Sequence, residues 1–91
     1  MTIPLHEKEL HKAIERLGFI RLFNQASGPR QYRLPMKEGE LYPRYHLIVR
    51  KIVMTKYRLV DIHIDWEQHT NSEAEHPLID QLIESIKQPQ A

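Results

Sequence analysis

Alternating apolar and polar side chains in the middle of the chain predict two long neighbouring β-strands. The segments 44–53 and 58–66 are rich in β-branched and aromatic residues, and the short link 54–57 joins them. A link of this length is typical of a hairpin, although the Asn-Gly or Asp-Gly signature is missing. We therefore expect antiparallel pairing with Val53 opposite Arg58, so that partner numbers sum to 111.

This pairing sorts the side chains of the hairpin onto two faces, because successive residues of a strand point to opposite sides. One face is almost wholly apolar and is expected to be buried. It holds Tyr45, Leu47, Val49, Val53, Val60, Ile62, Ile64 and Trp66, with Lys51 and Arg58 near the tip. The other face is mixed, and the register places His46 opposite Asp65, Ile48 opposite His63, and Arg50 opposite Asp61.

A helix is predicted near each end of the chain. Apolar residues with helical spacing indicate the first helix over 5–17, with Pro4 in its first turn and Gly18 just beyond its end. The second helix is predicted over 77–87. Its apolar stripe consists of Ile79, Leu82, Ile83 and Ile86.

Two shorter β-rich segments, 19–23 and 31–34, flank turn residues at 24–29 and add two strands. The element order is then α-β-β-β-β-α. We expect an α+β fold with an antiparallel sheet of three or four strands and both helices packed on its apolar face. Residues 1–87 are expected to form one domain and 88–91 a flexible C-terminal tail.

Composition narrows the class of protein. The chain has 91 residues, of which 41% are hydrophobic and 27% charged, and it has no cysteine. Disulfides and thiolate metal sites are thereby excluded. No apolar run approaches the length of a membrane span, so we expect a cytoplasmic protein without a membrane partner.

The formal charge is distributed unevenly along the chain. Residues 1–60 carry a net charge of +7 and residues 61–91 a net charge of −6.

The polar face of the hairpin contains a candidate metal site. His46, His63 and Asp65 are close enough in the predicted register to share a divalent metal ion. Asp61 could orient the ring of His63 through its other nitrogen. The same groups also suit metal-free acid–base catalysis, and they equally resemble an ordinary solvated ladder of cross-strand pairs.

Two further surfaces follow from the same hairpin. Basic residues of the sheet, namely Arg33, Arg44 and Arg50, are candidates for binding phosphate or nucleic acid. An apolar patch next to the polar cluster is a candidate dimer interface. It consists of Ile48, Ile52, Met54, Tyr57 and Leu59.

The leading functional prediction is a small non-catalytic binding or interaction domain that associates with itself through the long hairpin. Its other partner would be a protein or a nucleic acid. The alternative is a metal-binding protein, or a metal-dependent hydrolase or nuclease, that uses the His-His-Asp cluster. The sequence does not decide whether the protein is an enzyme, because it offers no independent nucleophile motif.

Overall fold

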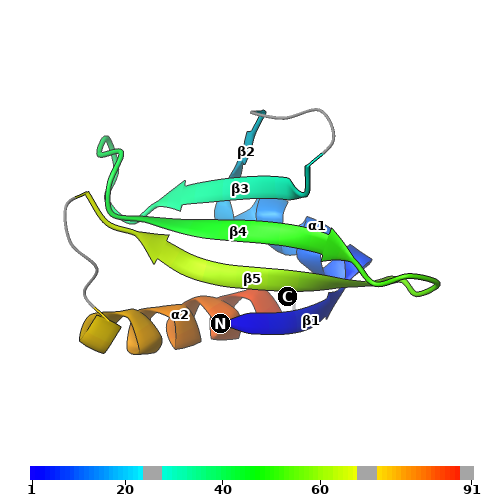
Figure 1. Cartoon of the computed structure of the whole chain (residues 1–91). Helices are drawn as coiled ribbons and strands as arrows, with labels where there is room; N and C mark the ends of the chain where they lie inside the picture. The colour runs from blue at the N-terminus through cyan, green and yellow to red at the C-terminus, as the bar shows by residue number, and fades with distance from the viewer. Residues whose placement is uncertain (24–27, 68–71, 89–91) are drawn as a thin grey trace.

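The computed structural model describes residues 1–23, 28–67 and 72–88, except for the side chains of 72–74. Five strands and two helices follow one another in this part of the chain (Figure 1). They are β1 (Thr2–His6), α1 (Glu7–Leu17), β2 (Ile20–Leu22), β3 (Arg30–Pro35), β4 (Arg44–Lys51), β5 (Tyr57–Asp65) and α2 (Ser72–Lys87). Parts of the predicted turn at 24–29 and of the predicted tail at 88–91 lie outside the described residues.

The five strands form one sheet in the order β1-β5-β4-β3-β2, and every neighbouring pair is antiparallel. The predicted α+β class and the antiparallel sheet are therefore confirmed. The predicted number of three or four strands is wrong, because the N-terminal segment contributes a fifth strand along β5.

The N-terminal segment is extended where the sequence predicted the start of a helix. Ile3 and Leu5 alternate toward the core, and Leu5 is buried. Pro4 is compatible with β1 because this strand lies at the sheet edge, where a missing N–H is tolerated. The ring of His6 then accepts a hydrogen bond that caps α1, so the helix begins at Glu7 instead of Leu5.

The second helix is longer than predicted. It begins at Ser72 instead of Pro77, so Pro77 lies inside it. In the added turns, the side chain of Glu75 accepts a hydrogen bond of 2.9 Å from the backbone N–H of Ile64. This contact gives the N–H of Ile64 in β5 an acceptor beyond the end of β1. The apolar periodicity of the helix does not reveal this role of Glu75. Neither α1 nor α2 combines the length and the apolar character needed to cross a bilayer.

One side of the sheet contributes to a single hydrophobic core. Leu47, Val49, Val60, Ile62 and Ile64 form its centre, and both helices add buried residues, namely Leu10, Ala13, Ile79, Leu82 and Ile86. No helix passes in front of the central strands in Figure 1. This other side of β4 and β5, termed the open face, carries His46, Ile48, Arg50, Leu59, Asp61, His63 and Asp65.

The pairing of β4 with β5 is shifted by two residues from the predicted register. Lys51 pairs with Arg58, and His46 lies across from His63 instead of Asp65. The other predicted pairs change in the same way: Ile48 lies across from Asp61, and Arg50 across from Leu59. The predicted faces are nevertheless correct within β4 and β5, because a shift of two residues leaves every side chain of the strands on its own side. Val53, which was predicted on the buried face, instead lies in the turn and is 83% exposed.

The turn explains the shift. A backbone hydrogen bond from the N–H of Ile52 to the carbonyl oxygen of Tyr57 closes the hairpin, so the four-residue turn is 53–56 instead of the predicted 54–57. The hydroxyl of Thr55 donates to the carbonyl oxygen of Ile52 at 2.9 Å and accepts from the N–H of Tyr57 at 3.1 Å. Met54 adopts a φ of 63°, in the left-handed region that Asn or Gly usually occupies. The turn is therefore held by a threonine side chain that the usual hairpin signatures do not include.

Because the two faces differ in burial, truncation of a leucine on each face should change the free energy of unfolding by different amounts. Leu47 is 0% exposed in the core, whereas Leu59 is 39% exposed on the open face. We expect Leu47→Ala to lower the free energy of unfolding by about 2–5 kcal/mol, because it leaves a cavity. Leu59→Ala should cost less than about 1 kcal/mol. Urea denaturation measures both, and equal losses would contradict the assignment of faces.

Candidate metal centre

Three side chains that can ligate a metal meet on the open face. His46 of β4 lies directly across from His63 of β5, and Asp65 follows two residues later on the same side of β5. One ligand atom from each of the three lies within 4.8 Å of the other two. Because side chains alternate along a strand, burial of Ile62 and Ile64 turns His63 and Asp65 toward His46.

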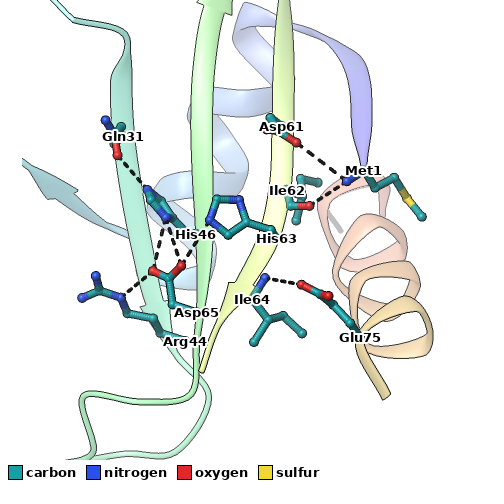
Figure 2. Close-up of polar contacts among 10 residues, drawn as sticks. All are labelled: Met1, Gln31, Arg44, His46, Asp61, Ile62, His63, Ile64, Asp65 and Glu75. Atoms are coloured by element: carbon teal, nitrogen blue, oxygen red, sulfur yellow. Dashed lines mark hydrogen bonds and ion pairs between the residues drawn. The ribbon is translucent and has the colours of Figure 1, made fainter. Parts of the chain in front are cut away.

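Asp65 is the centre of this cluster (Figure 2). Its Oδ2 lies 3.2 Å from Nδ1 of His46, and its Oδ1 lies 3.1 Å from Nε2 of His63. Arg44, directly across from Asp65, donates from Nε to Oδ2 at 3.0 Å. The guanidinium of Arg44 also lies 4.8 Å from the centre of the Tyr42 ring. The carboxylate is therefore held in place by groups from the neighbouring strand.

Gln31 of β3 orients the ring of His46. Its Oε1 lies 2.8 Å from Nε2 of His46 (Figure 2). The amide oxygen of Gln31 accepts from Nε2 in the tautomer of neutral His46 that presents the lone pair of Nδ1 to Asp65, whereas in the other tautomer Nδ1 donates to the carboxylate. In the first tautomer, a cation, either a proton or a metal ion, joins Nδ1 to the carboxylate oxygen 3.2 Å away.

The pKa values of His46 and Asp65 determine whether a proton can lie between them near neutral pH. Burial lowers the pKa of His46, and the nearby His63 adds to the lowering, while Asp65 opposes it. Burial by itself would raise the pKa of Asp65, but Arg44 and the two imidazoles together hold it below its usual value. His46 is thus neutral and Asp65 ionised near pH 7, which are the forms that bind a metal.

Two residues that support this cluster are not identified from the sequence in that role. Arg44 is expected there to bind phosphate, and Gln31 has no expected function. The pairing of Arg44 with Asp65 becomes visible only in the observed register of β4 and β5. Gln31 belongs to β3, and the sequence does not fix how that strand pairs with β4.

Asp61, which the sequence suggests as a partner for the ring of His63, makes its contacts with the start of the chain. It accepts a hydrogen bond of 3.4 Å from the hydroxyl of Thr2. Its carboxylate also lies 3.7 Å from the amino group of Met1 (Figure 2). These contacts connect β1 to β5, away from the metal-ligating atoms.

The three arginines expected to bind phosphate share the open face but do not form one cluster. Arg33 lies directly across from His46, on β3, and Arg44 contacts Asp65. Arg50 lies four residues beyond His46 along β4. Only Arg33 and Arg44 therefore flank the candidate metal centre.

The apolar residues expected at a dimer interface lie toward the hairpin tip. Met54 is 98% exposed, and Tyr57 and Leu59 are also exposed. Ile48 and Ile52 are half-buried. The ring of Tyr57 packs edge-on against His6, with 5.3 Å between the ring centres. The exposed part of the patch is thus Met54, Tyr57 and Leu59, whereas Ile48 lies next to the metal-ligating side chains, two residues beyond His46 on the same face.

Comparison with known proteins assigns no function. No family model, no curated protein and no solved structure matches the chain significantly. The function must therefore be inferred from the arrangement of the side chains themselves.

The lowered pKa of His46 predicts a pH dependence of stability in metal-free protein. The unfolded chain takes up a proton near pH 6.5, whereas folded His46 resists it, so acidification favours unfolding. The free energy of unfolding should fall between about pH 7 and 5. Asp65 affects stability over a lower pH range. Because folding lowers the pKa of Asp65, its stabilising contribution is lost only as the pH falls below the unfolded pKa of about 3.9.

Urea denaturation in EDTA across this pH range measures the effect. His46→Gln should weaken the pH dependence, whereas the control His76→Gln changes an exposed residue of α2 outside the cluster and should preserve it. A His46→Gln variant that retains the complete wild-type dependence would show that His46 is not its source.

Proposed function

We propose that this protein binds a divalent transition-metal ion through His46, His63 and Asp65. The observation that carries the proposal is the convergence of three lone-pair donors around one point, with their ligand atoms within 4.8 Å of one another. In particular, Nδ1 of His46 lies 3.2 Å from Oδ2 of ionised Asp65, so a metal ion between them would bind both residues.

The chemistry of the ligands favours some metals over others. Two imidazoles and one carboxylate suit zinc, iron and related ions, whereas magnesium prefers a shell of oxygen atoms. Three protein ligands also leave coordination positions for water or another ligand, as in catalytic metal sites. The half-exposed position of His63 gives such a ligand access from the open face.

The surrounding residues supply the orientation that metal ligands usually require. Gln31 accepts from the far nitrogen of His46 in the tautomer that presents Nδ1. Arg44 bonds to Oδ2 of Asp65 and leaves Oδ1 directed toward His63. Both contacts are hydrogen bonds between neighbouring strands, so the sheet itself preorganises the site.

Calorimetric titration of zinc into EDTA-treated, dialysed protein tests the proposal. We expect one zinc ion per chain, no uptake of magnesium, and loss of binding in His63→Ala. Gln31→Leu should weaken the affinity by about 10- to 100-fold, because the ring of His46 loses its orientation. His11→Ala is the matched control on α1 and should bind like the wild type. Stoichiometric zinc in both His46→Ala and His63→Ala would refute the site.

A second binding role is supported by the apolar patch near the hairpin tip. Its exposed members Met54, Tyr57 and Leu59 have no covering element in the described structure. Exposed apolar surface of this kind is typical of contacts between proteins. We propose that a second copy of the chain covers it, which makes the protein a homodimer.

Charges within the patch favour a second copy over an unrelated partner. Arg50 lies across from Leu59, and Asp61 lies across from Ile48, so opposite charges stand diagonally on the same surface. A two-fold axis between two such surfaces places Arg50 of one chain near Asp61 of the other. Arg50 forms no ion pair within the part of the chain that the structure describes.

Light scattering at high protein concentration should give a mass near twice 10.9 kDa. Leu59→Asp should reduce it to the mass of one chain, because a buried carboxylate opposes the contact. Leu41→Asp changes another exposed leucine outside the patch and should leave the dimer intact. A wild-type monomer, or equal effects of the two variants, would contradict self-association.

A further inference from the structure

A groove of about 500 Å³ between α1 and α2 collects basic side chains. Among the residues that the structure describes, four cations and a single carboxylate line it, together with His6 and Gln88. The charged residues are Lys8, Glu9, Lys12, Arg16 and Lys87. None of them is among the arginines that the sequence suggested for phosphate binding, and none belongs to the metal centre.

Local structure aligns the cations of α1. Lys8, Lys12 and Arg16 are four positions apart, and residues with this spacing share one side of a helix. His6 accepts a hydrogen bond of 3.1 Å from the backbone N–H of Lys8, which fixes the first turn of the row. The row is therefore a consequence of helix geometry and of a defined cap.

Arg16 connects this row to the second helix. Its guanidinium donates to the carbonyl oxygens of Ser85 and Gln88 at the end of α2. These bonds hold the last turn of α2 next to α1, and Lys87 thereby reaches the same groove. The fourth cation thus comes from a segment far away in the sequence, which explains why sequence reasoning missed the group.

The row of positive charges on α1 destabilises the helix when no anion is bound. Like charges four positions apart destabilise a helix, and Lys8 in the first turn opposes the positive end of the helix dipole. Within the described residues, none of Lys8, Lys12 and Lys87 forms an ion pair. A bound polyanion would attract each of these side chains and so offset their mutual repulsion.

We infer that the groove binds the phosphate backbone of a double-stranded nucleic acid. Phosphates are recognised by Lys and Arg without any need for apolar contact. Cores of protein interfaces are instead enriched in aromatic residues and depleted of Lys, and single strands stack their bases on aromatic rings. In the described part of the chain, no large apolar side chain lines this groove, and the ring of His6 is already packed against Tyr57.

Fluorescence polarisation with a short labelled DNA duplex tests the inference in about 50–200 mM NaCl. Four phosphate contacts predict a slope of about −3.6 for log K against log salt. The double variant Lys8→Glu/Lys12→Glu should weaken binding at every salt concentration and make this slope shallower by about 2. Lys37→Glu/Lys51→Glu makes the same change in net charge on exposed residues outside the groove and should keep the wild-type slope.

Circular dichroism verifies that both double variants fold. Equal losses in the two variants would mean that net charge, and not the groove, attracts DNA. Displacement of the duplex by polyglutamate at equal charge concentration would reassign the groove to an acidic protein, and tighter binding of the separated strand would exclude the duplex. Zinc titration of Lys8→Glu/Lys12→Glu should remain unchanged, because the metal centre shares no residue with the groove.

Discussion

The antiparallel pairing of β4 with β5 determines which side chains enter the core and which meet on the open face. Burial of Val60, Ile62 and Ile64 on one side requires His63 and Asp65 to point to the other. A slip by one residue would exchange the two sets, so the hydrophobic effect opposes it strongly. The candidate metal centre is therefore maintained by the same burial that stabilises the sheet, even though its own residues add little apolar area.

Within this frame, the ionised carboxylate of Asp65 organises the polar cluster. Arg44 and the two imidazoles offset the cost of its partial burial, so its pKa is lowered despite desolvation. His46 experiences the opposite balance, because burial and His63 together outweigh the attraction of Asp65. Burial and His63 therefore keep the ring of His46 neutral near pH 7 even though ionised Asp65 lies beside it. A neutral imidazole next to a carboxylate is a suitable metal site. The contacts of Gln31 and Arg44 then act as orienting bonds and not as isolated surface pairs.

Strand periodicity was sufficient to predict the hairpin of β4 and β5, its two faces and the three candidate ligands, because period-two alternation is strong in 44–66. It could not give the register, since a shift of two residues preserves every face and the turn is closed by Thr55 instead of an Asn-Gly pair. The short strand before α1 was missed because Pro4 also suits a helix start. The roles of Gln31 and Arg44, and the groove between the helices, depend on pairings across the fold that local patterns do not encode.

The pairing of β4 with β5 brings the three proposed metal ligands together on the open face of the sheet. Anomalous diffraction at the zinc absorption edge, from crystals of zinc-loaded protein, tests this placement most directly. We predict a single strong peak bounded by Nδ1 of His46, Nε2 of His63 and a carboxylate oxygen of Asp65. Zinc bound only at other histidines, with that position unoccupied in zinc-saturated crystals, would contradict it.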